Sequence, residues 1–506
     1  MPAKDDPTDA ALRKGADRSD RPPDVRPALR MLNRLASVDD ADRDVDKQER
    51  AALIHARLDR LPATRYLWTL LLMISLGGAF EFYDLFLMGY IGPGLVRSGM
   101  FTSGSAYLLG MSGLAAFVAS TFVGLFIGTL AFGFAADRFG RRAVFTYSLL
   151  WYSAATFVMA FQTTTGGVLL WRAITGVGIG VELVTIDTYI AELMPKHLRG
   201  RAFAINQVVQ FSAVPFVAFI AWVLVPRAPL GVDGWRWVVL IGSAGAILVW
   251  FIRRSIPESP RWLIARGKLV EAERVTAMME RRVAAESRAP LPAPDPEPPR
   301  TAGGSIDFLH IFRAPYGSRT FMLMVFNFAQ TIGYYGFASW VPTLLMAAGI
   351  KTTASLGYSF AIALSAPVGP LLIARFADGM DRKWQIVSSA SAIAVFGLLF
   401  ARQTEAAGLV VFGVLLTCVN NWMSVAFHTY QSELFPTQVR AQAVGFVYSW
   451  SRFSAIFTSL MIGFLLNHFG VNGVFVFIAA AMLVAAVSIG VFGPRTSGLA
   501  LEAIAS

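Results

Sequence analysis

The sequence is poor in charged residues, histidine and cysteine. Only 15% of its 506 residues are charged, and it holds five histidines and one cysteine, Cys418. A soluble globular protein carries about 25% charged residues, so the deficit indicates that lipid surrounds much of the chain. A single cysteine excludes an intramolecular disulfide and a metal site built from thiolates. The mean hydropathy of +0.53 agrees with a membrane protein.

Motifs of nucleotide-driven pumps and of hydrolases are also absent. The sequence has no glycine-rich phosphate loop followed by Lys-Ser or Lys-Thr, no HExxH and no nucleophile elbow. We therefore expect no enzyme activity, no cofactor and no bound metal. The polar start of the chain lacks the apolar core of a signal peptide, so no cleavage is predicted.

Long apolar runs dominate the rest of the chain. Twelve of them approach the roughly 20 residues that a helix needs to cross a bilayer. The predicted spans lie near 66–91, 107–135, 143–162, 167–194, 202–225, 235–252, 319–345, 355–377, 384–402, 407–432, 441–467 and 471–492. The chain is therefore expected to be an all-α membrane protein with twelve transmembrane helices.

The net charge of +11 follows this topology and does not indicate a nucleic-acid site. Of the 44 Lys and Arg residues, almost all fall on the side that carries both termini. The exceptions are Arg97, Arg227, Arg236, Lys351 and Arg402 on the other side, and Arg172 and Arg452 within spans. Positive charge gathers on the cytoplasmic side, so both termini should be cytoplasmic. We expect a multi-pass protein of a plasma membrane, of the bacterial inner-membrane type, that contacts lipid and no nucleic acid.

The spans divide the chain into five predicted parts. These are a cytoplasmic extension (1–65), an N-terminal six-helix bundle (66–252), a cytoplasmic central loop (253–318), a C-terminal six-helix bundle (319–492) and a cytoplasmic tail (493–506). The extension ends in an amphipathic stretch, 47–61, which predicts a helix on the membrane interface or, alternatively, a plain linker helix. The central loop holds a predicted helix, Leu269–Glu286, before a proline-rich spacer at 289–299.

The two bundles are related by an internal repeat. The segment at 188–195, Thr-Tyr-Ile-Ala-Glu-Leu-Met-Pro, matches Thr-Tyr-Gln-Ser-Glu-Leu-Phe-Pro at 429–436, an offset of 241 residues. The segment at 133–142 matches that at 374–383 with the same offset. Two unrelated motifs that share one offset indicate a duplication. We therefore predict two pseudo-symmetric six-helix bundles.

The loop after the second span carries Gly133-xxx-Asp137-Arg138-x-Gly140-Arg141-Arg142, which resembles the signature of the major facilitator superfamily. Glycine lets helices approach closely, and an acid with arginines can bridge helix ends. In that family the cluster latches the outward-open state, so the resemblance implies a cytoplasmic gate. The gate is predicted to include these residues and Glu192, Arg199, Glu258, Arg261, Asp378, Arg382, Glu433 and Arg440.

Two further motifs are similar to those of sugar porters within the superfamily. They are Pro257-Glu-Ser-Pro-Arg-Trp-Leu263 and Pro494-x-Thr496-x-Gly498-x-x-Leu501-Glu502. Arg495 stands where the family usually has glutamate and the repeat copy at 374–383 is degenerate, so a weaker latch is expected in the C-terminal half. The segments Glu81-Phe-Tyr-Asp84 and Gly180-Val-Glu182-Leu183 resemble instead the metabolite, aromatic-acid and niacin-type proton symporters.

Ionisable residues at membrane depth are candidates for proton coupling, because charge is costly there. Glu81 and Asp84 lie three residues apart on one helix face, so both should not ionise together. In sugar porters the acid that matches Asp84 pairs with an arginine of span four, which the resemblance places at Arg172. We predict Asp84 as the main proton-linked group, tuned by Arg172, with Glu81 and Glu182 also involved. A static ion pair that only fixes helix packing is the alternative.

Arg452, deep in span eleven with Tyr448 one turn away, is the predicted anion-binding residue. A buried guanidinium suits a carboxylate, whereas a pair with His428 or Glu433 would give it a structural role. Polar residues in apolar spans must face protein or water. The other candidates for substrate binding are Gln207, Gln210, Asn327, Gln330, Tyr334, Asn420, Asn421 and Trp450.

Residues and resemblance together predict a secondary transporter that works by alternating access. The expected activity is proton-coupled symport of a small organic anion, an aromatic or other monocarboxylate. A sugar or polyol porter, a drug exporter and a nutrient sensor that binds without transport are the alternatives. The expected partners are a small-molecule substrate and protons, and the expected state is a monomer.

Overall fold

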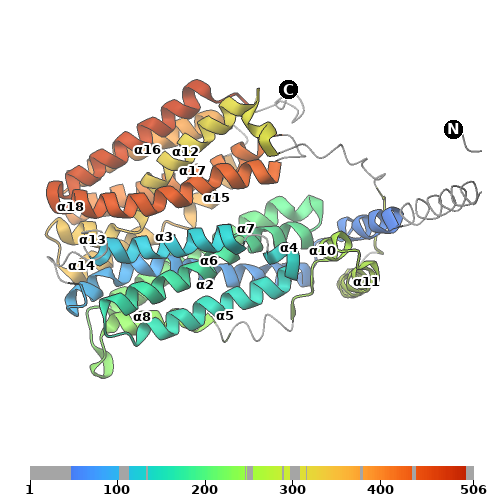
Figure 1. Ribbon diagram of the computed structural model, residues 1–506, viewed down its shortest axis with the longest axis horizontal. Coiled ribbons are helices and arrows are strands. Elements are labelled where there is room, and N and C mark those ends of the chain that lie inside the picture. Colours follow the sequence, from blue (N-terminus) through green and yellow to red (C-terminus); the bar gives the residue numbers. More distant parts are fainter. Residues whose placement is uncertain are drawn as a thin grey trace, which may run out of the picture.

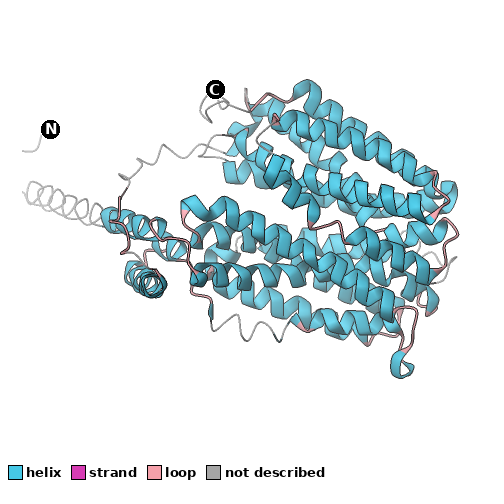
Figure 2. Ribbon diagram, turned by 180° about the vertical axis from the view of Figure 1, so that it is seen from behind, coloured by secondary structure: helices cyan, strands magenta, loops and turns pink. Residues whose placement is uncertain are grey.

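The computed structural model describes residues 47–101, 113–132, 135–245, 247, 255–287, 290–296, 308–314, 316–376, 380–435 and 440–496. Every regular element within these ranges is helical, in agreement with the predicted all-α fold. The helices lie side by side in two bundles, and a smaller group of helices stands at one end (Figures 1 and 2).

The N-terminal half holds the first six predicted spans. Its helices are α2 (Arg65–Arg97), α3 (Gly113–Phe132), the short α4 (Ala135–Phe139), α5 (Arg141–Ala160), α6 (Thr165–Leu193), α7 (Arg199–Leu224) and α8 (Gly234–Ser243), with single turns η2 (Lys196–Leu198) and η3 (Pro229–Gly231). Only the start of the sixth predicted span, 235–252, falls within the described residues.

The C-terminal half repeats this arrangement. Its helices are α12 (Tyr316–Ala338), α13 (Val341–Ala347), α14 (Thr352–Ala363), α15 (Val368–Phe376), α16 (Arg382–Ala401), α17 (Ala406–Glu433) and α18 (Arg440–Phe492), preceded by the turn η4 (Phe308–Phe312). Helix α18 contains the last two predicted spans, separated at Gly470, where φ is 64°.

Nine helices of the described ranges are long and apolar enough to cross a membrane. One of them is α18, which supplies two spans, and another covers α14 and the start of α15. The two spans outside this set are α8, described for ten residues, and α12, which carries polar residues along its length. A described helix thus lies within each of the twelve predicted spans.

Helices α3 and α6 pack with their backbones in contact. Gly124 and Gly128 on α3, and Gly176 and Gly180 on α6, leave no room for a side chain, and a Cβ on Gly124 would lie 1.9 Å from a carbonyl oxygen of α6. A spacing of four residues places each pair on one helix face. This close approach brings Arg172 of α6 up to α2 and α3.

The repeat is visible in matching contacts of the two halves. Arg141 pairs with Glu192 in the first half, and Arg382 pairs with Glu433 in the second. Both residues of the second pair stand 241 positions after their counterparts. Because the same ion pair forms twice at the predicted offset, the duplication extends from the sequence to the contacts.

A second matching contact joins a tyrosine to a proline carbonyl. The hydroxyl of Tyr189 on α6 donates to the backbone oxygen of Pro257. The hydroxyl of Tyr430 on α17 donates to the backbone oxygen of Pro494 at 2.9 Å. Each half therefore ties the segment after its sixth span to its fourth helix.

Shorter helices cover one end of the N-terminal half. They are residues 47–59, α10 (Pro260–Ala265) and α11 (Leu269–Glu286), and α11 has the predicted bounds. The helix at 47–59 turns Ile54 and Leu58 inward, and Leu61 just after it is also buried. Protein thus covers Ile54 and Leu58 of the apolar face that we expected on the membrane interface, whereas Leu53 is 40% exposed.

Glu280 fastens this N-terminal helix to α11. Its carboxylate accepts hydrogen bonds from Arg57 at 2.6–3.2 Å and from Arg60 at 2.6 Å. Burial by itself raises the pKa of Glu280, but the hydrogen bonds from both arginines outweigh it and hold the pKa below its usual range. The carboxylate is therefore ionised at neutral pH and keeps both arginines in place.

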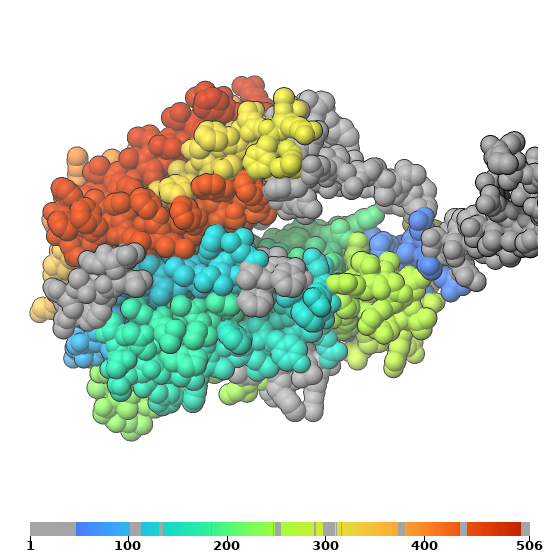
Figure 3. Space-filling model, viewed as in Figure 1, coloured from blue at the N-terminus to red at the C-terminus, as the bar shows by residue number. Residues whose placement is uncertain are grey.

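The two halves touch at one end and separate at the other. Away from α10 and α11, Gly89 of α2 packs on the backbone of Ser339, and Trp222 of α7 stacks on Phe360 of α14 with ring centroids 5.8 Å apart. At the α10–α11 end the space-filling view shows a hollow between the halves (Figure 3). The space between the halves is therefore closed at one end and open at the other.

The substitution Glu280→Gln should release the helix at 47–59 without unfolding the bundles. It removes the negative charge that holds two arginines, and hydrogen bonds to charged groups contribute about 1.5–3 kcal/mol. Limited digestion with trypsin should cleave after Arg50, Arg57 or Arg60 several-fold faster than in the parent protein. In the parent protein, low pH should also release the helix, because Glu280 loses its charge as the pH falls through its lowered pKa.

The matched control is Glu273→Gln. Glu273 is 63% exposed and lies 3.6 Å from Arg57, so its loss should leave the cleavage rate unchanged. Equal cleavage rates in the two variants would show that Glu280 does not hold the helix.

Candidate functional site

The predicted pair of Arg172 and Asp84 is present inside the N-terminal half. Arg172 Nη1 donates to Asp84 Oδ1 at 2.7 Å, and neither side chain is more than 1% exposed. Arg172 also donates to the backbone oxygen of Asp84 at 2.6 Å and to the hydroxyl of Thr121 at 2.8 Å. Thr156 donates to Asp84 Oδ2 at 2.6 Å. Four helices, α2, α3, α5 and α6, therefore meet at one pair of charges.

Both members of this pair are saturated with partners. Each carboxylate oxygen of Asp84 accepts a hydrogen bond, and Nε, Nη1 and Nη2 of Arg172 each donate one. Buried charges are stable when their remaining hydrogen-bonding positions are filled in this way. The geometry favours the static pair over Asp84 as a group that exchanges a proton.

Glu81 stands one turn before Asp84 but faces other groups. It is fully buried, and neither carboxylate oxygen has a hydrogen-bond partner in the described part of the chain. The charged groups that act on it most strongly are Arg452 of α18 and Asp187 of α6. Three residues turn a helix by about 300°, so the side chains of Glu81 and Asp84 point about 60° apart. Asp84 is not among the groups that act most strongly on Glu81, and Arg172 and Thr156 hold its carboxylate, so the acid pair expected from their spacing stays a prediction.

Glu182 of α6 is a second buried acid near Glu81. The Ser148 hydroxyl lies 3.4 Å from one of its oxygens, and the other oxygen has no partner among the residues described. Glu182 interacts electrostatically with Glu81, and Asp187, further along the same helix, is exposed. Glu81 thus interacts with both other acids, and one of them, Asp187, is exposed.

Arg452 supplies the facing positive charge from the C-terminal half. It is 5% exposed and donates to the hydroxyls of Tyr335 at 3.1 Å and Tyr448 at 3.3 Å. Within the described ranges no acidic side chain lies within 4.0 Å of it, and Glu433, one of its predicted alternatives, pairs with Arg382 instead. The partners of Arg452 among the described residues are thus two neutral phenols, and a buried cation is stabilised by a nearby anion.

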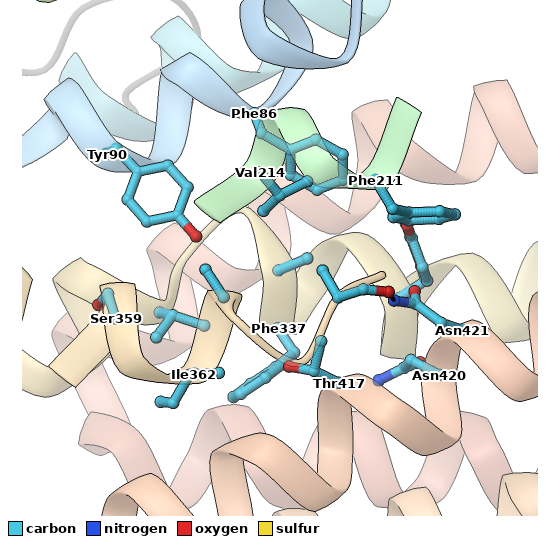
Figure 4. Close-up of a pocket in the computed structure, with 15 residues that line it drawn as sticks. Phe86, Tyr90, Phe211, Val214, Phe337, Ser359, Ile362, Thr417, Asn420 and Asn421 are labelled. Atoms are coloured by element: carbon cyan, nitrogen blue, oxygen red, sulfur yellow. Dashed lines mark hydrogen bonds between the residues drawn. The ribbon is translucent and has the colours of Figure 1, made fainter. Parts of the chain in front are cut away.

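A small cavity lies between the halves (Figure 4), and Arg452 is not among the residues that line it. Its volume is about 40 Å³, and Tyr334, the neighbour of Tyr335, contributes to its wall. Phe86 and Tyr90 of α2 line one side, and Thr417 of α17 lines the other. One water needs about 10–15 Å³, so the cavity has room for a few waters but not for a metabolite.

Three of the predicted substrate residues line this cavity: Tyr334, Asn420 and Asn421. The side-chain oxygen of Asn420 has no hydrogen-bond partner within the described ranges, whereas Asn421 donates to a backbone oxygen at 2.8 Å. Gln210 is buried against Gly78 of α2, where a Cβ would lie 2.4 Å from the amide nitrogen.

The other predicted substrate residues do not line it. Asn327 donates within its own helix, and Gln330 donates to a neighbouring threonine. Gln207 is half-buried on α7, and Trp450 packs edge-on against the exposed ring of Phe453. The structure gives these four residues no place at the cavity wall.

Asn206 of α7 was not predicted and is the most prominent addition. It is fully buried, and both its amide nitrogen and its oxygen are without partners in the described chain. Tyr152 and Ser153 of α5 likewise keep buried hydroxyls without partners there. Gln207 was selected because it is a polar residue inside an apolar span, and Asn206 meets the same criterion. Nothing in the sequence distinguishes Tyr152.

The charged motif of the first half forms one network at the α10–α11 end. Arg141 donates to both oxygens of Glu192 at 2.8–3.1 Å and pairs with Asp137 at 2.8 Å. Glu258 accepts the backbone N–H groups of Arg141 and Arg142 at 3.0 and 3.2 Å. A carboxylate at this position satisfies the free N-terminal amides of α5.

Gly140 makes room for Glu258. Its φ is +100°, and a Cβ there would lie 2.4 Å from Glu258 Oε2. The matching position of the second half is Asp381, whose own carboxylate accepts the N–H of Lys383 at 2.9 Å and caps α16. The second half thus caps α16 with Asp381, although position 495 holds arginine in place of the usual glutamate. This cap compensates at α16 for the weaker latch that we expected in the C-terminal half.

The remaining gate residues are divided between the N-terminal helix and positions that are not described. Arg261 and Arg199 approach the Asp59 carboxylate at 2.7 and 3.9 Å, and Arg138 is exposed. Gly133, Asp378 and the side chain of Arg440 lie outside the described residues. No ion pair between residues that the structure describes joins the two halves.

Two six-helix halves related by a repeat, with buried charges where they meet, define a multi-pass membrane transporter of the major facilitator type. Residues 70–506 match the family described as "Sugar (and other) transporter", and the chain belongs to that family. It is accordingly a transporter and not an enzyme.

Several bacterial transport proteins are similar along nearly their whole length. The niacin transporter NiaP of Acinetobacter baylyi is 28% identical, over 89% of this chain and 99% of that protein. The inner membrane metabolite transport protein YdjE of Escherichia coli is 29% identical, over 89% and 98%. The 4-hydroxybenzoate transporter PcaK of A. baylyi is 26% identical, over 89% and 96%.

Among solved structures, the xylose transporter XylE from E. coli, in a partially occluded inward open conformation, has a TM-score of 0.67. It is 22% identical and covers 86% of this chain and 99% of its own. At this identity the likeness supports the fold alone.

Asp84→Asn should lower stability, because Arg172 then remains a buried cation without a counter-ion. Breaking a buried pair costs about 3–5 kcal/mol, so the thermal midpoint of the purified protein should fall clearly. Asp233→Asn is the matched control, since Asp233 is 46% exposed and lies 3.7 Å from Arg236. An unchanged midpoint in Asp84→Asn would indicate that this carboxyl is already protonated.

Proposed function

We propose that the protein is a proton-coupled symporter of a small organic anion, an aromatic or other monocarboxylate, and works by alternating access. The observation that carries the proposal is Arg452, a buried guanidinium that meets no carboxylate among the described residues. Arg452 lies twelve residues after Arg440, the first residue of α18. At a rise of 1.5 Å per residue this places it about 18 Å along the helix, at membrane depth. A charge there needs a counter-ion, and a carboxylate substrate supplies one.

The orientation follows from the distribution of positive charge. The α10–α11 end carries the arginine-rich motif and the basic N-terminal helix, which assigns it to the cytoplasm. The hollow between the halves opens at this end (Figure 3). The structure therefore corresponds to an inward-facing state, in which the opposite end is closed by the contacts of Gly89 and Trp222.

The apolar lining of the cavity suits an aromatic ring once the cavity has widened. Phe86, Phe211 and Phe337 line it, and offset or edge contacts between rings contribute about 0.5–1.5 kcal/mol each. Niacin and 4-hydroxybenzoate, the compounds in the names of two relatives, both carry a carboxyl group on a ring. With a volume of about 40 Å³, the cavity must widen before such a molecule enters.

Proton coupling requires an acid that can gain and lose a proton during the cycle. Glu81 and Glu182 have buried oxygens without partners in the described ranges, and each acts on the other. Two neighbouring carboxylates out of water do not readily ionise together. We therefore assign proton coupling to Glu81 and Glu182, and a structural role to Asp84 with Arg172.

A sugar or polyol porter is the second candidate. The family description and the fold of XylE favour it, and the amides of Asn420 and Asn421 offer hydrogen bonds to hydroxyl groups. A sugar, however, gives Arg452 no negative charge. Competition by hexoses, but not by carboxylates, in an uptake assay would select this candidate.

Arg452→Met should abolish carboxylate uptake by purified protein in proteoliposomes. Truncating one member of a buried charge pair costs about 2–5 kcal/mol of binding, which corresponds to a loss of affinity of roughly 30-fold or more. Uptake of labelled nicotinate, benzoate and 4-hydroxybenzoate would be measured with an inward proton gradient and without one.

Arg402→Met provides the matched control, because Arg402 is exposed at the far end of α16. It should leave uptake unchanged. Full carboxylate affinity in Arg452→Met would contradict the assignment of Arg452 as the anion-binding residue. Equal uptake with and without the proton gradient would contradict proton-coupled symport.

A further inference from the structure

Glu81 and Arg452 belong to different halves and act on each other electrostatically. Arg452 is the first charged group that acts on Glu81, and Glu81 is the only carboxylate among the groups that act most on Arg452 in the described chain. They do not form an ion pair within 4.0 Å: Arg452 contacts phenols, and the oxygens of Glu81 have no described partner. The two groups therefore act on each other without direct contact, and the oxygens of Glu81 remain without a described hydrogen-bond partner.

The surroundings of Glu81 are mostly acidic or neutral. The titratable and charged groups that act on it or feel its charge are Arg452 and Tyr335 from the C-terminal half, and Tyr152, Glu182 and Asp187 from the N-terminal half. One guanidinium thus serves as the counter-ion for a group of acids. Adding the carboxylate of a substrate places one more negative charge on the same cation, in a region of low dielectric.

We infer that ionised Glu81 and the carboxylate of the substrate compete for Arg452, so that an anion binds only when Glu81 has taken up a proton. This inference rests on the proposed function, because it requires an anionic substrate. The proton moves from water to a carboxylate oxygen of Glu81, and no covalent bond to the substrate is made or broken. One proton is therefore taken up with each anion bound.

Asp84 is less suited than Glu81 to take up the proton that accompanies anion binding. Its oxygens accept hydrogen bonds from Arg172 and Thr156 within one half, so protonation would strand a buried arginine. Glu81 loses no hydrogen bond to a described residue when it is protonated. Asp187 of α6, the other acid that acts on Glu81, is exposed.

The position of the two residues links charge to movement. Glu81 lies on α2 and Arg452 on α18, so their attraction acts across the boundary at which the halves rock. An ionised Glu81 draws the empty halves together, whereas a protonated Glu81 leaves Arg452 to the substrate. One shared cation is enough for such coupling. If the proton on Glu81 raises the affinity for the substrate anion, the bound anion raises the affinity for the proton by the same factor.

Binding at several pH values tests the competition. Full-length protein in detergent would be titrated with nicotinate, benzoate and 4-hydroxybenzoate, and the tightest of them would be studied between pH 8 and pH 6. Its affinity should rise by up to about tenfold per pH unit, as linkage of one proton requires. The substitution Glu81→Gln should remove this dependence and fix the affinity near the low-pH value of the parent.

Two control variants isolate the role of Glu81. Glu405→Gln changes an exposed glutamate at the start of α17 and should keep the full pH dependence. Glu81→Asp retains an acid and should keep a pH dependence, which preserves the test if Glu81→Gln does not fold. The thermal midpoint and elution profile of each variant would report its folding.

The outcomes separate the inference from the proposed function. If none of the three carboxylates binds the parent protein, the anionic substrate is wrong, and the competition falls with it. If a carboxylate binds through Arg452 with the same affinity at every pH, the substrate class stands and the competition is wrong. A pH dependence that survives in Glu81→Gln but disappears in Glu182→Gln would likewise overturn the role of Glu81.

Discussion

Arg172 and Asp84 form an ion pair that sits inside the N-terminal half, out of reach of water. Charges at that depth persist only if every donor and acceptor around them is used, and hydroxyls of Thr121 and Thr156 complete the set. The glycines of α3 and α6 bring the helix axes close enough for the arginine to reach α2. Because Asp84 is held in this way, Glu81 one turn away is the acid of α2 left without a partner in the described chain.

The halves differ in charge where they meet. The N-terminal half presents acids, with Glu182 and Glu81 buried and Asp187 exposed, and the C-terminal half presents Arg452 among tyrosines. Attraction between such surfaces depends on how many of the acids are ionised. The number of protons bound by these acids and the attraction between the halves are therefore linked.

Local sequence patterns predicted the elements and the contacts within each half. Apolar run length located the spans, and the shared offset anticipated that Arg141 with Glu192 and Arg382 with Glu433 would form equivalent pairs. The partner of Asp84 came from family resemblance. The neighbours of Glu81 were not predictable, because Arg452 lies 371 positions later and the packing of α18 decides where it points.

Amphipathic patterns carried a similar ambiguity. The stretch at 47–61 shows that one face needs an apolar partner, but the pattern is the same whether that partner is lipid or protein. In the structure Ile54 and Leu58 pack against protein, which the pattern does not reveal. Asn206 was overlooked for a simpler reason: it stands among several polar residues of α7, and burial, not composition, distinguishes it.

The cap of α5 has a consequence for how the molecule divides. Glu258 satisfies the first amides of α5, and Trp262 and Arg266 donate to the backbone oxygen of Asp137, so the first half is complete only when it includes residues after its last span. The second half closes α16 with its own Asp381. The duplicated halves are thus unequal as modules. A chain severed beyond α11 keeps both units whole, whereas one severed at residue 252 leaves the first unit with an open helix end.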